Sequence, residues 1–176
     1  MSVKPFKISV ANLFTYGIEY FDDPKNPMGT SLQKTVNYPL TELGTKKSLS
    51  HIHGKIKVQI GREIIIGGED VCISEVIDMI GECLFSFDNG KELHEWYDVE
   101  EPEGVLYYFK KKDDKTVILG IKETTKAKLV AWRYLTFLLS EMRTEYEKFK
   151  ITVLNEVKQQ NPQSLKEYEQ SFIFSK

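Results

Sequence analysis

The sequence predicts an α+β domain: a mainly antiparallel sheet of about five or six strands, with one middle helix and a long C-terminal helix packed on it. Three patterns support this prediction. Apolar and polar residues alternate in several short segments, residues 71–85 keep a helical apolar period, and residues 125–160 contain neither proline nor glycine. At 176 residues, 41% of them hydrophobic, the chain has the size of one compact domain. We expect a single domain over residues 1–176, with the sheet and the middle helix in 1–123 and the C-terminal helices in 124–176.

The N-terminal part is predicted to be strand followed by an irregular connection. Phe6, Ile8 and Val10 share one face of PFKISV, which is the two-residue period of a half-buried strand. The segment TYGIEYF continues the alternation and predicts a second strand or a bent extension of the first. Two prolines and a glycine in DDPKNPMG then interrupt regular structure. We expect residues 30–49 to be irregular, with or without a short helix.

A hairpin, a helix and a second hairpin are predicted for the middle of the chain. The alternation in KIKVQI, followed by Gly61-Arg62, predicts a strand and a type II′ turn, with residues 63–66 returning. Apolar residues at helical spacing predict the helix over residues 71–85. The segments VLYYFKKK and TVILGIKE, joined at Asp113-Asp114, predict two further strands.

The C-terminal third is predicted to be helical. One continuous helix over residues 125–160 would be roughly 50 Å long, more than a domain of this size covers by itself. Its apolar residues follow steps of three and four, as in a coiled-coil seam, so we expect part of it to pack on a second copy in a homodimer. The members of this predicted dimer seam are Trp132, Leu135, Leu139, Met142, Tyr146, Phe149 and Val153. Asn161-Pro162 ends the helix, and a capping box at Ser164 opens a last short helix.

The order of these elements resembles that of small uncharacterised bacterial α+β proteins, among them immunity proteins that neutralise toxins. The resemblance rests on the hairpin KIKVQIGREIII, the acidic helix ISEVIDMIGECL, Trp96, and the hairpin VLYYFKKKDDKTVILGI before a C-terminal helix. It spans residues 55–155 and includes no signature residues. It therefore implies an order of elements and carries no site residue over.

Charge is distributed unevenly along the chain. Residues 63–103 contain 13 acidic residues and the single base Lys91, a net charge of −12, whereas the whole chain carries −2. Such a surface would speed association with a basic protein, so we predict a non-enzymatic protein-binding module, immunity-like or antitoxin-like. The residues predicted to contact this partner are Glu69, Asp70, Asp98, Glu100, Glu101 and Glu103. The alternative is that the carboxylates of the middle helix, such as Asp78 and Glu82, are only its solvent-facing side.

His51 and His53 suggest a different function. Alternate residues of a strand share a face, so the two imidazoles could bind one metal ion, and a metal-binding protein or metal-dependent enzyme is the alternative function. No third ligand stands at a diagnostic spacing, and the simpler interpretation is that both residues begin a strand. The segment His94–Asp98 resembles the zinc motif H-E-x-x-H, but Asp98 replaces the second histidine.

Other functional classes have little support in the sequence. No nucleophile motif, phosphate-binding glycine loop or cofactor motif occurs, so we predict neither catalytic residues nor a cofactor. Lys110, Lys111 and Lys112 beside aromatic residues indicate a protected sheet edge, and a pI near 6.0 disfavours nucleic acid. Cys72 and Cys83, the only two cysteines, are predicted to be too far apart to pair. Free thiols, with no apolar span and no secretory signal, predict a cytoplasmic protein outside the membrane.

Overall fold

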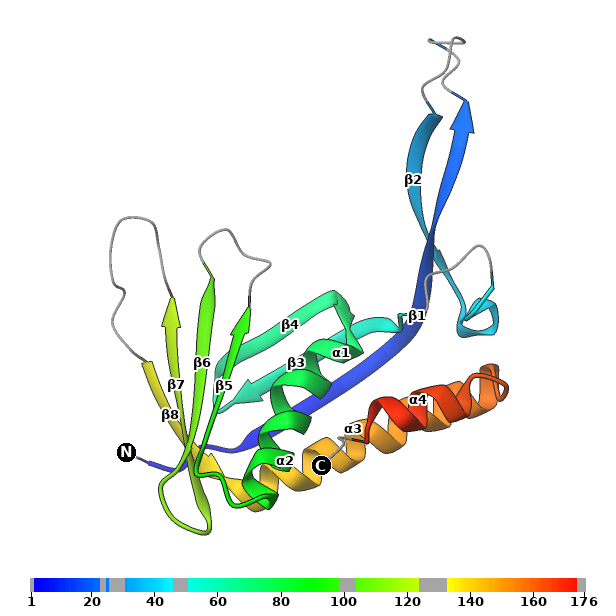
Figure 1. The fold of residues 1–176 in the computed structure, drawn as a ribbon. Helices are drawn as coiled ribbons and strands as arrows, with labels where there is room; N and C mark the ends of the chain where they lie inside the picture. Colours follow the sequence, from blue (N-terminus) through cyan, green and yellow to red (C-terminus); the bar gives the residue numbers. More distant parts are fainter. Residues whose placement is uncertain are drawn as a thin grey trace.

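Two antiparallel sheets form the framework of the structure, a computed structural model that describes residues 2–22, 25, 31–45, 51–98, 104–123 and 133–173 (Figure 1). The first sheet has the order β2-β1-β3-β4 and consists of β1 (Phe6–Asp22), β2 (Ser31–Tyr38), β3 (His53–Ile60) and β4 (Glu63–Cys72). The second has the order β5-β6-β7-β8 and consists of β5 (Leu93–Asp98), β6 (Val105–Lys111), β7 (Thr116–Glu123) and β8 (Arg133–Leu138). The α+β class is confirmed, with the strands divided between two sheets.

The helices lie against these sheets. They are α1 (Ile73–Val76), α2 (Glu82–Asp88), α3 (Leu139–Gln160) and α4 (Leu165–Ser171). A π-helical turn, η2 (Ile77–Gly81), joins α1 to α2, and a 3-10 turn, η1 (Leu40–Glu42), follows β2. One hydrophobic core joins the sheets and helices, and Phe6 of β1 meets Phe137 of β8 there with ring centroids 5.0 Å apart. No helix within the described ranges is long and apolar enough to cross a membrane.

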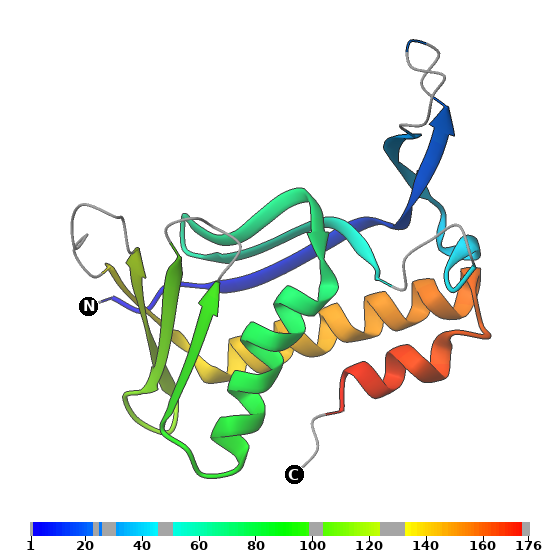
Figure 2. The same ribbon diagram turned by 45° about the horizontal axis from the view of Figure 1, so that its top comes forward.

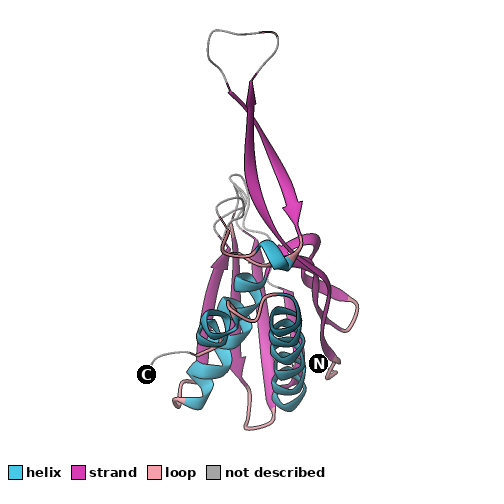
Figure 3. Cartoon of the chain, turned by 90° about the vertical axis from the view of Figure 1, so that its right-hand side faces the viewer, coloured by secondary structure: helices cyan, strands magenta, loops and turns pink. Residues whose placement is uncertain are grey.

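Strand β1 pairs with different strands in its two halves. Its first half pairs with β3, its second half from Thr15 to Asp22 pairs with β2, and the register shifts between Ala11 and Phe14. Asn12 in this shift has φ +52°, a left-handed conformation that asparagine tolerates better than most residues. The irregularity bends the strand, as bulges do. Residues 15–22 and 31–38 therefore project from the body as a two-stranded ribbon, which we call the arm (Figures 1 and 3).

Helix α3 lies along the first half of β1, beneath it in Figure 2. Among the described strands only β3 pairs with this half of β1, so no described strand covers its other edge. The backbone amides of Phe6 and Ile8 donate to the carboxylates of Glu141 and Glu145, at 3.1 and 3.2 Å. Residues two apart in a strand point the same way, and residues four apart in a helix lie one turn apart, so the two spacings match. Side chains of the helix thus accept hydrogen bonds from backbone amides at an edge where a further strand could otherwise pair.

The predicted beginning of the long helix is wrong. Residues 133–138 form β8, and α3 starts only at Leu139. In this segment Leu135 and Phe137 face the core and pair with β7, so a period of two describes it better than a helical period. The shorter helix does not need a second copy to cover it. The seam residues described in β8 and α3 are all buried within their own chain, whereas Trp132 lies outside the described residues.

Other sequence predictions have mixed outcomes. The Gly61-Arg62 turn is confirmed, with φ +63° at Gly61, and the middle helix spans 73–88 rather than 71–85. The predicted irregular region contains β2 and η1, while residues 46–50 lie outside the described part. The three lysines that begin at Lys110 do not mark an edge, because β6 lies between β5 and β7. The last helix begins after Ser164 as predicted, although its side chain makes no capping hydrogen bond.

Candidate interaction surface

The middle helix buries one broad face and exposes a narrow acidic one. Its buried residues crowd the region around η2, from Val76 to Gly81, because a π turn inserts one residue into the helical repeat. Asp78 and Glu82 remain on the exposed side, and Asp88 ends the helix. The helical spacing places Asp78 and Glu82 one turn apart, along the same stripe as Phe85.

A groove runs beside this stripe, between the middle helix and α3. It has a volume of about 340 Å³ and is open to solvent. Its lining residues are Gly81, Leu84, Phe85, Asp88, Arg143, Tyr146, Glu147, Lys150 and Phe172. The aromatic side chains make a flat apolar lining, and charged groups surround it. Such a combination suits a ligand with an apolar stem and a charged end.

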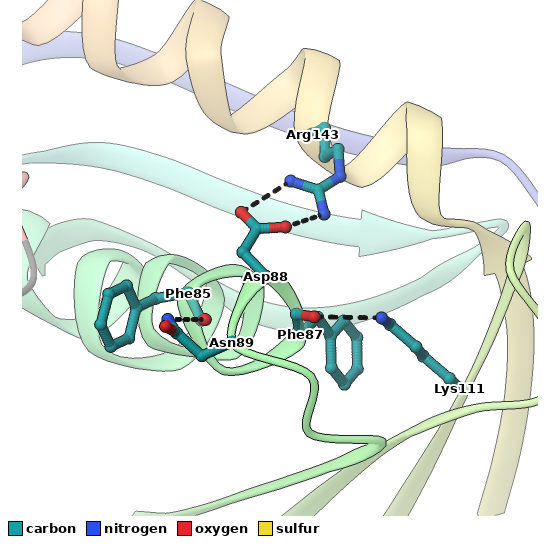
Figure 4. Close-up of polar contacts among 6 residues, drawn as sticks. All are labelled: Phe85, Phe87, Asp88, Asn89, Lys111 and Arg143. Carbon is teal, nitrogen blue, oxygen red and sulfur yellow. Dashed lines mark hydrogen bonds and ion pairs between the residues drawn. The ribbon is translucent and has the colours of Figure 1, made fainter. Parts of the chain in front are cut away.

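One end of the groove is held by a network at the C-terminus of α2 (Figure 4). Both guanidinium Nη atoms of Arg143 donate to the Asp88 carboxylate, one of them at 3.1 Å, and this pairing lowers the Asp88 pKa. Lys111 donates to the Phe87 carbonyl at 3.1 Å and lies 5.0 Å from the Phe87 ring centroid. A cation at this helix end also complements the helix dipole. The exposed Asp88–Arg143 ion pair joins α2 to α3 at this end of the groove. It adds at most about 1 kcal/mol to stability.

Asp78 and Glu82 lack such partners. Neither forms an ion pair with any residue that the structure describes. Partial burial raises the pKa of Asp78, and partial burial followed by the Asp78 charge raises the pKa of Glu82. Both shifts mean that the ionised carboxylates lose hydration without gaining a counter-charge. A cation placed beside them would remove this penalty.

Tyr146 contributes a second unsatisfied group. Its side chain lines the groove and is 5% exposed, and its hydroxyl has no hydrogen-bond partner in the described part of the chain. Burial is the main cause that raises its pKa, and the charges of Glu147 and Asp78 add to the shift. A buried hydroxyl without a partner is costly, and native structures contain few of them. The groove therefore contains an unused donor, and the uncompensated carboxylates of Asp78 and Glu82 lie on the same helix as its lining residues Gly81 and Phe85.

The predicted acidic patch is only partly visible in the structure. Glu69 pairs with Lys55 at 2.5 Å, and Asp70 lies 2.8 Å from the imidazole of His53. Glu63, outside the patch but within the acidic segment, pairs with Arg133 at 3.5 Å. The side chain of Asp98 and all of Glu100, Glu101 and Glu103 lie outside the described residues. Basic residues from elsewhere in the chain thus offset part of the acidic segment, and its net charge overstates the negative surface.

The histidines occupy structural positions. His53 begins β3 as predicted, is 8% exposed, and lies between the rings of Phe14 and Tyr16 at centroid distances of 6.0 and 4.5 Å. Burial lowers its pKa, and the neighbouring Asp70 opposes the shift. His51 is exposed outside the strand. Within the described ranges no three histidine, cysteine or carboxylate side chains come together, and metal binding by His51 and His53 stays a prediction.

His94 does not form a helical zinc motif. It lies in β5, where the backbone is extended, so the helical H-E-x-x-H geometry is not available. Its Nδ1 lies 3.3 Å from the Ser86 hydroxyl, and burial lowers its pKa. Trp96 packs beside Tyr107, with ring centroids 5.3 Å apart. The segment thus supplies core contacts between β5, β6 and α2.

Sequence reasoning missed Arg143, Tyr146 and Lys150 as groove residues. Tyr146 belongs to the apolar period of α3 and looks there like any core aromatic, while the two bases resemble ordinary exposed residues of a helix. Only the packing of α3 against the middle helix brings them to the acidic stripe.

Comparison of the chain with protein-family models, with curated proteins and with solved structures found no match.

Proposed function

We propose that the protein is a non-enzymatic module that binds a basic protein partner, as an immunity-like or antitoxin-like protein does. The observation that carries the proposal is the pair Asp78 and Glu82, two carboxylates without a described counter-charge on the same helix as the groove residues Gly81 and Phe85. An arginine or lysine of the partner supplies the missing cation. Its aliphatic stem lies on Phe85 and Phe172, as such stems cover apolar surface elsewhere.

The partner's side chain also matches the two carboxylates. An arginine guanidinium has five N–H donors, so it can donate to both Asp78 and Glu82. Arg143 already shows the same chemistry on Asp88, within the same groove. Bidentate pairing favours arginine over lysine, because the planar guanidinium matches a carboxylate. The proposal therefore specifies an arginine-bearing protein segment.

Two features of the chain agree with a protein partner in the cytoplasm. Cys72 and Cys83 are both free thiols, which suits the reducing cytoplasm. A pI near 6.0 disfavours nucleic acid as the partner, because binding to phosphates needs an excess of basic residues.

A matched pair of variants tests the proposal. Asp78→Asn with Glu82→Gln removes the two charges on the helix beside the groove, while Glu92→Gln with Glu95→Gln removes two exposed charges at the start of β5. Tagged wild-type protein and both variants are used to capture proteins from the host lysate at low salt, and the bound proteins are identified by mass spectrometry. We expect one basic protein to bind the wild type and the control, and the groove variant at least about tenfold more weakly. Equal capture by both variants would contradict the assignment of the groove.

A defined probe tests the recognised group without knowledge of the partner. N-acetylarginine amide is titrated into isotopically labelled protein, and amide chemical shifts are followed by NMR. We expect saturable shifts at Gly81, Phe85 and Tyr146, weaker shifts with N-acetyllysine amide, and none with the uncharged N-acetylcitrulline amide. Equal shifts with arginine and citrulline probes would show that charge is not what the groove recognises.

A further inference from the structure

We infer that the arm of one molecule binds the outer face of the second sheet of another copy, so that the chain associates with itself. The arm carries exposed apolar side chains on both of its faces. Ile18 and Tyr20 share one face and are 42% and 63% exposed, and Phe21, on the opposite face, is 45% exposed. In Figure 3 no helix or sheet covers the ribbon on either side.

A ribbon of this kind needs a partner. Strand β2 pairs only with β1 and packs on no other described element to a comparable extent. An isolated two-stranded hairpin is at best marginally stable in water, because neither face can bury its apolar residues. A third layer against the arm would cover Tyr20 or Phe21 and stabilise the ribbon.

The second sheet presents a matching surface. Figures 1 and 3 place the helices on its inner face, and several side chains of the outer face are exposed, although Thr136 on that face is buried. Cross-strand pairing brings together the outward-facing residues Leu93, Glu95, Tyr97, Tyr108, Lys110 and Tyr134. Among them Leu93, Tyr97 and Tyr134 are 40%, 50% and 46% exposed. Clustered exposed aromatic residues of this kind mark interaction surfaces.

The charges favour a second copy as the occupant. On the arm, Glu19 and Lys34 stand directly opposite each other across β1 and β2. On the outer face, Glu95 and Lys110 belong to neighbouring cross-strand pairs of β5 and β6. Glu19 and Lys34 lie on the Phe21 face of the arm, and Lys122 joins Lys110 on the outer face, so each surface offers both signs of charge beside an aromatic residue. Neither surface has the single sign that a basic or a nucleic-acid partner would select.

The two surfaces cannot meet within one molecule. Figures 1 and 2 place the arm at one end of the body and the second sheet at the other. A contact between arm and face therefore joins different molecules through two unlike surfaces, which is a heterologous interface. This contact is separate from the acidic groove, and the two proposals can fail independently.

The test uses one variant on each surface and one matched control. Phe21→Glu changes the arm on the face of Glu19 and Lys34, Tyr134→Glu changes the outer face, and Ile151→Glu changes an α3 side chain that is 56% exposed and belongs to neither surface. Circular dichroism and thermal melting check folding, and Leu93→Glu replaces Tyr134→Glu if that variant does not fold. Sedimentation equilibrium measures mass against the 20.4 kDa of one chain.

We expect the wild type and Ile151→Glu to associate, and each surface variant to associate at least about tenfold more weakly. An equimolar mixture of the two surface variants should recover association, because each supplies the surface that the other has lost. A monomeric wild type at the highest attainable concentration overturns the inference. A mixture that stays monomeric overturns it as well. Association of one surface variant by itself at wild-type strength would instead indicate contacts between two arms or between two faces, and would also overturn it. The groove variant Asp78→Asn with Glu82→Gln should associate like the wild type.

Discussion

Replacing Tyr146 with phenylalanine is expected to stabilise the protein, which is unusual for a change in a core residue. The ring is 5% exposed, and its hydroxyl has no hydrogen-bond partner in the described structure. A buried polar group without a partner costs about 1–3 kcal/mol, and removing one oxygen leaves the ring packing nearly unchanged. We expect a gain of about 1–2 kcal/mol in the free energy of unfolding. For a chain of this length that gain raises Tm by roughly 2–8 °C.

A matched substitution supplies the control. The Tyr107 hydroxyl donates to the Ile65 carbonyl at 3.3 Å, and the side chain is 7% exposed. Tyr107→Phe removes a hydrogen bond and should lower stability by about 0.5–1.5 kcal/mol. Urea unfolding followed by circular dichroism measures both variants under identical conditions. A loss of stability in Tyr146→Phe similar to that in Tyr107→Phe would refute the reasoning, because the Tyr146 hydroxyl would then have a partner.

Three further predictions follow from burial and charge. The Asp78 pKa is raised above its ordinary 3.8, so the folded state loses stability as pH rises from 3.8 through the raised value. Asp78→Asn should remove this loss and raise the urea midpoint at pH 7. The pKa values of His53 and His94 are lowered below 6.5, so their contribution is complete above pH 6.5 and is lost as pH falls through the lowered values. His94→Gln should flatten Tm between pH 7 and 5, and an unchanged slope would assign the dependence elsewhere. Met142 is 0% exposed, so Met142→Glu should unfold the chain and Met142→Ala should cost about 2–5 kcal/mol in urea unfolding. If the wild type associates and Met142→Glu is a folded monomer, Met142 would instead lie in a seam between molecules.

The sequence predicted the elements that local pattern controls. The Gly61 turn, the start of a strand at His53 and the apolar face of the middle helix all depend on residues close together in the chain. The division into two sheets depends on long-range pairing and on the bulge after Ala11, which alternation alone does not reveal. The segment before Leu139 was assigned to helix because apolar residues fit a helical period and a strand equally well there.

The groove was less predictable than the fold. Asp78 and Glu82 could be read from the sequence as exposed carboxylates, but their lack of a described counter-charge depends on which residues the fold brings near them. The unsatisfied Tyr146 hydroxyl cannot be inferred from a pattern that describes every core aromatic alike. The summed charge of the acidic segment was misleading for the same reason, because ion pairs such as Lys55–Glu69 join distant residues.

The closure of the β1 edge by Glu141 and Glu145 also determines when the chain can finish folding. These carboxylates lie 135 and 137 residues after the amides that they accept from. During synthesis, β1 leaves the ribosome more than a hundred residues before α3. Contacts across such long separations form late and slowly, and open strand edges favour aggregation. The nascent chain therefore carries an open β1 edge until α3 has been made, and chaperone demand should be greatest just before α3 emerges.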